Sequence, residues 1–104
     1  MSKNKGFSST SANRYSLALY ELAAEANVLS KIEINVLSII NLIEKSNDFK
    51  NLIKDPTVSQ NDLSNAIDKI FDYLKIENLL KNFTNFLVIK RRFFFVEQIL
   101  NILF

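Results

Sequence analysis

The residues of this chain that could do chemistry are its carboxylates and one basic–aromatic cluster. Two carboxylate pairs lie at helical spacing: Glu21 with Glu25, and Asp68 with Asp72. Such pairs serve as acid and base when burial drives their pKa values apart. Each pair falls opposite a stripe of apolar residues, so both are expected on solvated helix surfaces. The pattern therefore argues against acid–base catalysis.

The densest charge in the chain is Lys90-Arg91-Arg92, and Phe93-Phe94-Phe95 follows it directly. Cations beside aromatic rings can bind single-stranded nucleic acid through phosphate contacts and base stacking. The favoured interpretation is a turn between helices, with the cations in water and the phenyl rings in the core. Nucleic-acid binding, with Arg14 and scattered lysines extending the cluster, is the alternative.

Most other catalytic groups are absent from the sequence. The 104 residues include no histidine, no cysteine and a single glycine, Gly6. This composition excludes Cys/His metal sites, Ser-His-Asp triads and glycine-rich phosphate loops. We therefore expect a protein that is not an enzyme, with no catalytic, cofactor-binding or metal-binding residues.

The composition favours one helical domain. Hydrophobic residues make up 48% of the chain, enough for a folded core. One glycine and one proline, Pro56, leave few turn signals for a sheet protein. The formal charge of +2 is too small to predict nucleic-acid binding by itself. No apolar stretch approaches the roughly 18 residues of a membrane-spanning helix, so direct membrane insertion is not expected.

Apolar residues recur at helical spacing almost throughout, which predicts an all-α fold, a single six-helix bundle. The first helix is expected over about 11–27, the fifth over about 76–89, and the last through 95–103. Capping-box patterns predict that the second helix opens at Ser30, with Glu33, and the fourth at Ser59, with Asp62.

A short third helix is expected between the second and the fourth. Ser46 or Asn47 can cap its start. Asp55-Pro56 ends it, because the residue before proline avoids the helical region.

The first predicted helix is apolar on two sides. One stripe comprises Tyr15, Ala18 or Leu19, Leu22 and Ala26, and the other comprises Leu17, Tyr20 and Ala24. A helix with two apolar sides must be covered twice. A groove beside it would accept the apolar face of a partner helix, so a helix-binding module is the leading functional class.

The two ends of the chain differ in character. Residues 1–12 are expected to form a disordered N-terminal tail; they are serine-rich and acid-free, in faint similarity to a mitochondrial presequence. The other end, from Ile99 to Phe104, stops in an apolar run without a polar exit. That ending favours a chain that stops before a second domain.

Three segments in the same order resemble one protein family. Residues 14–23 resemble an Arg-x-Tyr-Ala-x-Ala-Leu-Phe/Tyr-Glu-Leu-Ala helix, residues 51–59 a Leu-Leu-x-Asn-Pro-x-Val-Ser turn, and residues 85–93 a Phe-Leu-x-Leu-Leu-x-x-Asn-x-Arg-Leu segment. The family is the delta subunit of bacterial F-type ATP synthases, whose mitochondrial counterpart is the oligomycin-sensitivity-conferring protein. Lys90 replaces the usual Asn, and Glu97 the common Pro.

The resemblance covers residues 13–104 and implies the six-helix N-terminal domain of that subunit, with its C-terminal domain missing. It implies a non-catalytic stator subunit in the peripheral stalk of a proton-translocating ATP synthase. The N-terminal domain would bind the N-terminal helix of alpha subunits, and the missing domain would bind the b subunits. The location implied is the cytoplasmic face of the bacterial inner membrane, or the matrix side of the mitochondrial inner membrane.

In this family the groove for the alpha helix lies between the first and fifth helices. Carried onto matching positions, its walls would be Tyr15, Ala18 and Leu22, and Phe83, Phe86 and Leu87. For each residue taken alone, plain core packing remains an equal alternative.

The second functional hypothesis is an RNA-binding helical bundle similar to the antitermination factor NusB. That family has a similar Ala-Leu-Tyr stretch in its first helix, and Arg14, Lys90, Arg91 and Arg92 would contact phosphates. The small net charge and the short chain weigh against it.

Overall fold

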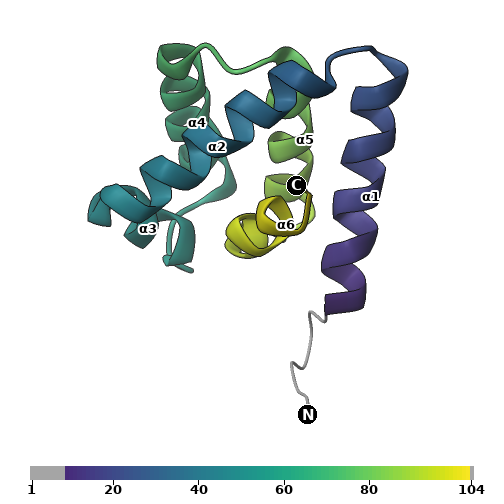
Figure 1. Cartoon of the computed structure of the whole chain (residues 1–104). Coiled ribbons are helices and arrows are strands. Elements are labelled where there is room, and N and C mark those ends of the chain that lie inside the picture. Colours follow the sequence, from purple (N-terminus) through teal and green to yellow (C-terminus); the bar gives the residue numbers. More distant parts are fainter. Residues whose placement is uncertain (1–8, 104) are drawn as a thin grey trace.

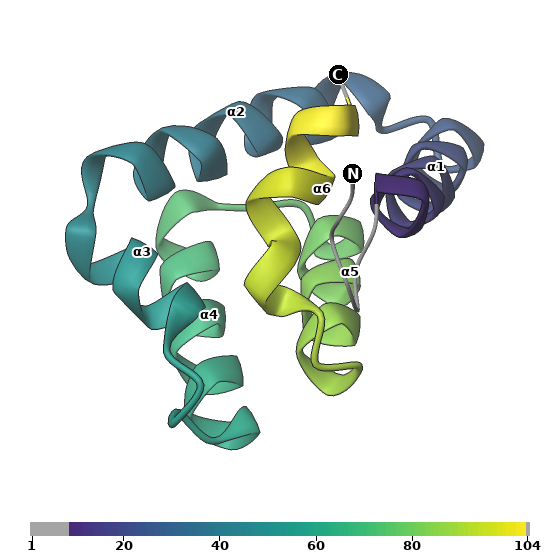
Figure 2. The same cartoon turned by 90° about the horizontal axis from the view of Figure 1, so that it is seen from below.

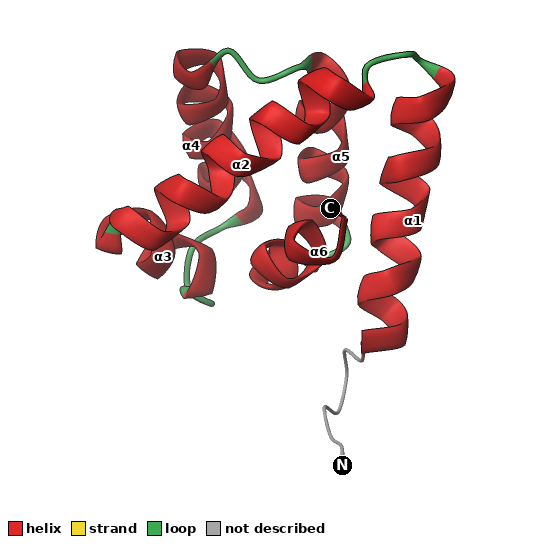
Figure 3. Cartoon of the chain, viewed as in Figure 1, coloured by secondary structure: helices red, strands yellow, loops and turns green. Residues whose placement is uncertain are grey.

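The computed structural model describes residues 9–103, which contain six α-helices, one 3₁₀-helix and no strand. The elements are α1 (Ser9–Glu25), α2 (Leu29–Lys45), α3 (Asn47–Lys54), α4 (Gln60–Leu74), α5 (Asn78–Ile89), η1 (Phe93–Phe95) and α6 (Val96–Leu103). The predicted all-α, six-helix fold is confirmed (Figure 3). Among the helices of this range, none combines the length and the hydrophobicity needed to span a membrane.

The start of α1 corrects the expected tail. Residues 9–12 belong to the first turn of α1, and Ala12 is completely buried. The rest of the expected tail, residues 1–8, lies outside the described residues. Residues 9–12 are therefore helical, although the sequence pattern assigns them to the tail.

The last helix, α6, lies at the centre of the bundle. Figure 2 shows it between α1 on one side and α3 and α4 on the other, with α2 running past it. The contact between α1 and α6 is the most extensive in the fold. At the edge of the molecule, α1 and α5 lie side by side and run in opposite directions (Figure 1).

The buried faces of α2 and α4 agree with the sequence pattern. The fully buried residues of these two helices are Ile32, Val36, Ile39 and Ile43 in α2, and Ile67 and Phe71 in α4. They recur every three or four residues, so each helix turns a single stripe toward the core. Here the large apolar side chains alone identify the buried side.

The buried face of α1 differs from both predicted stripes. It consists of Ala12, Ser16, Leu19 and Ala23, which face the core between the two stripes. Three of these side chains are small, which allows α1 to approach α6 closely. The larger residues Leu17 and Leu22 lie on either side of this face and stay half-exposed. The periodicity argument follows the large apolar side chains. It therefore missed a buried face that consists mainly of small residues.

Two of the predicted helix starts are confirmed and one is wrong. The hydroxyls of Ser46 and Ser59 accept hydrogen bonds from backbone N–H groups at the starts of α3 and α4. Ser30 does not cap α2, because the helix begins one residue earlier and Val28 is its N-cap. The connection from α1 is only three residues long, so the chain re-enters a helix before Ser30.

Three helices are followed, one or two residues after their ends, by a residue in the left-handed conformation that is not glycine. These residues are Asn27, Lys75 and Arg91, with φ of 59°, 59° and 60°. In each case the following N–H bonds to a carbonyl five residues back, the pattern of a Schellman cap. A chain with one glycine thus makes its tight turns at some conformational cost.

Candidate functional site

An apolar concavity between α1 and α5 is lined by residues that the sequence comparison assigns to a partner-helix groove. Its volume is about 450 Å³, and we call it the α1–α5 groove. The lining residues are Tyr15, Ala18 and Leu22 from α1, and Leu79, Asn82, Phe83 and Phe86 from α5. Residues three or four positions apart share one face of a helix, so each helix forms one wall.

The structure brings five of the six expected groove residues together. Leu87, the sixth, is completely buried and does not line the groove. Two lining residues, Leu79 and Asn82, were not among those expected. Leu79 precedes Phe83 by four residues and shares its face, which was a usable signal. Asn82 carried no such signal, because a polar residue at that spacing usually marks solvated surface.

The groove keeps large apolar side chains in contact with water. Leu22 is 50% exposed and Phe86 is 45% exposed, whereas Phe83 is buried and forms the floor. The ring of Tyr15 from α1 and the ring of Phe86 from α5 are tilted relative to each other, with centroids 6.4 Å apart and an interplanar angle of 57°. The small side chain of exposed Ala18 leaves room between these rings and Leu22.

One end of the groove is basic. A second hollow shares Tyr15, Ala18 and Phe86 with it and adds Ser11, Arg14 and Arg92. The Nζ atom of Lys90 lies 5.7 Å from the centroid of the Phe86 ring, within cation–π range. Arg14 and Arg92 are far apart in sequence, and both line this end of the groove.

The favoured interpretation expects all three consecutive phenylalanines in the core. The structure places only some of them there. Phe93 is buried, Phe95 is half-buried and Phe94 is 50% exposed. The Nζ of Lys54 lies 5.2 Å from the centroid of the Phe94 ring, so a cation covers part of the exposed face. The 3₁₀ turn is the physical reason, since three successive residues there point in three directions.

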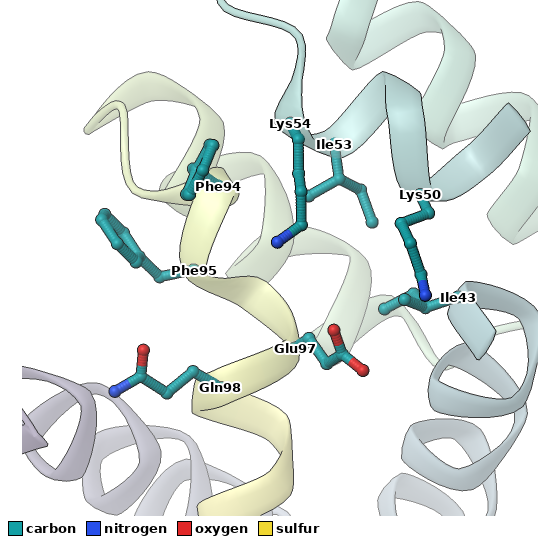
Figure 4. Close-up of a pocket in the computed structure, with 8 residues that line it drawn as sticks. All are labelled: Ile43, Lys50, Ile53, Lys54, Phe94, Phe95, Glu97 and Gln98. Carbon is teal, nitrogen blue, oxygen red and sulfur yellow. The ribbon is translucent and has the colours of Figure 1, made fainter. Parts of the chain in front are cut away.

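A small pocket lies beside this turn, between α3 and α6. Figure 4 shows Lys50 and Lys54 extending from α3, Phe94 from η1 and Glu97 from α6. Because the lining carries both signs of charge, it lacks the uniformly basic character of a phosphate-binding surface.

The carboxylate pairs lie on helix surfaces, apart from the groove floor. Asp72 pairs with Lys81, and Asp68 accepts a long hydrogen bond of 3.4 Å from the side chain of Asn85. Glu21 and Glu25 are both exposed. Within residues 9–103 there is no group of three or more potential metal ligands.

The carboxyl group whose pKa the fold clearly moves is that of Asp55, in the turn between α3 and α4. The hydroxyl and the backbone N–H of Thr57 both donate hydrogen bonds to its Oδ1, at 2.6 and 2.9 Å. These bonds favour the ionised form and lower the pKa of Asp55, the hydroxyl having the larger effect. These hydrogen bonds stabilise the turn between α3 and α4. Neither Asp55 nor Thr57 lines the α1–α5 groove.

Comparison with known proteins decides between the two functional classes. The family described as "ATP synthase delta (OSCP) subunit" matches residues 12–103. The chain belongs to this family. The match gives no support to the NusB-like alternative.

Curated relatives agree with the family match. The ATP synthase subunit delta of Pelagibacter ubique is 62% identical over 100 residues, covering 96% of this chain and 54% of the relative. That of a Ruegeria species is 31% identical over 103 residues, covering 99% and 55%. The chain therefore spans about half the length of the relatives that it matches. No solved structure matches the chain.

Proposed function

We propose that this chain is the domain of a delta-type subunit that binds the N-terminal helix of ATP synthase alpha subunits. In this proposal residues 13–104 correspond to the N-terminal domain of the family. The whole subunit is a non-catalytic part of the peripheral stalk. The observation that carries the proposal is the α1–α5 groove, which exposes apolar side chains on a member of this family.

A helix is the partner that suits the shape of this groove. Its walls are two antiparallel helices whose backbone groups are already hydrogen-bonded, so neither wall offers a free edge to an extended peptide. The side-chain ridges of a third helix fit between two others and would cover Leu22 and Phe86. Ala18 lets such a helix approach closely. The groove therefore favours an amphipathic helix over a strand or a small ligand.

The proposed role is mechanical. A stator subunit holds the catalytic head against the torque of the rotating shaft, which requires affinity and stiffness and no reactive group. In the whole subunit, a second domain would bind the b subunits. The subunit would lie peripherally on the cytoplasmic face of a bacterial inner membrane, or on the matrix side in an organelle, without inserting directly.

The test is calorimetric titration of this chain with a peptide of the N-terminal helix of the Pelagibacter ubique alpha subunit. We expect saturable one-to-one binding with a negative heat-capacity change, because apolar surface leaves water. Failure of the peptide to bind a chain shown to be folded by circular dichroism would contradict the proposal. A parallel titration with single-stranded RNA at several salt concentrations would reveal the alternative as steeply salt-dependent binding.

A further inference from the structure

The α1–α5 groove is electrically different at its two ends. Arg14 and Arg92 line the end formed by the start of α1 and the end of α5, and Lys90 lies over Phe86 beside them. At the opposite end Leu22 and Leu79 line the groove, and no charged residue is among its lining residues.

No described carboxylate forms an ion pair at the basic end. Within the described residues the ion pair formed is that of Lys81 with Asp72, so neither Arg14 nor Arg92 is paired with a carboxylate. The nearest acid along α1 on the same side is Glu21, seven residues and so about 10 Å further along the helix axis. That distance exceeds the screening length of about 8 Å at physiological salt. Their charge is thus available to a partner.

The position of these two arginines also favours recognition of carboxylates. Arg92 is half-buried, which makes its interactions stronger than those of a fully solvated cation. A guanidinium offers a planar fork of N–H donors that matches the two oxygens of a carboxylate. The half-exposed side chain of Phe86 lines the same hollow and excludes part of the surrounding water.

The α1 residues toward the far end carry the opposite charge. Glu25 follows Ala18 by seven residues, which places it on the same face of α1, and it is exposed. The charges along α1 therefore run from Arg14 at one end of the groove to the exposed carboxylates of Glu21 and Glu25 toward the other end. A charge gradient of this kind attracts one arrangement of a partner's charges and repels the reverse.

We propose that the groove selects an amphipathic helix by charge as well as by its apolar face. The partner carries carboxylates on the turn that lies over Arg14 and Arg92, and none on the turn beside Glu25. The apolar seam supplies most of the affinity, and the charged ends set the register and direction of the helix. This inference rests on the proposed function, since it assumes that a helix occupies the groove.

Three synthetic peptides of about 18 residues, or five helical turns, test the inference. They share one apolar face and differ at two positions of the first turn, which are Glu, Gln or Lys. At low salt we expect affinity to fall in the order Glu, Gln, Lys, with at least a tenfold range that shrinks at high salt. Equal affinities for the three peptides would overturn the inference.

Matched variants separate a local effect from net charge. In the double variant Arg14→Gln with Arg92→Gln, the three peptides should bind within about twofold of one another. The control, Lys31→Gln with Lys45→Gln, removes the same charge from exposed positions on α2 and should keep the full range. The same loss of selectivity in both would contradict the inference.

The location of the acidic end gives an independent readout. A nitroxide attached beside the two Glu residues should broaden the NMR amide signals of Ser11 and Arg14 more strongly than those of Leu22 and Leu79. Stronger broadening at Leu22 and Leu79 than at Ser11 and Arg14 would overturn the charge assignment. The failures are distinguishable: if no peptide binds, the groove assignment fails, whereas binding without charge dependence removes only the present inference.

Discussion

The hydroxyl of Ser16 donates a buried hydrogen bond to the backbone carbonyl oxygen of Ile99, across 83 residues of sequence. It joins the first helix to the last at the most extensive contact of the fold. Because Ser16 lies between Ala12 and Ala23 on a face of small residues, its oxygen can reach the backbone of α6. The same contact holds α1 in place as one wall of the groove.

Replacing Ser16 with alanine should lower the free energy of unfolding by about 1 kcal/mol, since a buried hydrogen bond is lost with little change in packing. Urea denaturation followed by circular dichroism measures the difference. A Ser16→Ala variant as stable as the parent chain would show that this bond contributes nothing to docking of α1.

Two serines distinguish a true helix cap from a misleading capping pattern. Ser59→Ala should cost about 1 kcal/mol of stability, because the hydroxyl accepts the N–H of Asp62 at the start of α4. Ser30→Ala should change stability by less than about 0.5 kcal/mol, because Ser30 lies inside the first turn of α2 and is exposed. Equal losses in the two variants, measured by urea denaturation, would be inconsistent with the observed caps.

The left-handed residue at the end of α4 predicts a stabilising substitution. Lys75 has φ of 59°, a conformation that is costly for a residue with a Cβ atom and free for glycine. Lys75→Gly should therefore raise the melting temperature or leave it unchanged. Lys69→Gly, in the middle of the same helix, should lower stability by about 1 kcal/mol. A drop in both variants would argue against the Schellman cap at Lys75.

A bulky substitution tests the groove itself. Ala18→Trp should weaken binding of the alpha-subunit peptide at least tenfold, about 1.4 kcal/mol, because an indole would fill the space for the partner backbone. Ala24→Trp, at another exposed position on α1, is the control and should bind normally. Both variants should keep the helical circular dichroism of the parent. Unchanged affinity of a folded Ala18→Trp variant would refute the groove assignment.

The turn at Asp55 predicts a specific pH dependence. Thr57 lowers the pKa of Asp55 in the folded chain, so the stabilisation is complete above the pKa of the unfolded chain. It is lost as the pH falls through the lower pKa of the folded protein. Thr57→Val removes the hydroxyl donor and should raise that pKa, as measured by NMR titration of the side-chain carboxyl. An unshifted titration would mean that the hydroxyl bond is absent in solution.

The sequence by itself determined features that depend on residues close together in the chain. Ser46 and Ser59 cap helices through N–H groups three residues away, and Asp55-Pro56 ends α3 by a steric effect on its neighbour. The helical spacing of large apolar residues likewise agrees with the buried faces of α2 and α4. Motifs in three segments pointed to the family before any geometry was available.

Tertiary structure alone decided which side of α1 is buried and what its other sides do. The face of α1 that packs on α6 contains the small residues Ala12, Ser16 and Ala23. Small side chains let the two helices approach closely, so the contact buries more surface than these side chains alone would. That choice left Leu22 facing α5 and brought Arg14 to Arg92. Burial depends on partners distant in sequence, whereas caps and periodicity do not, so the groove and its charged end emerge only when the helices pack.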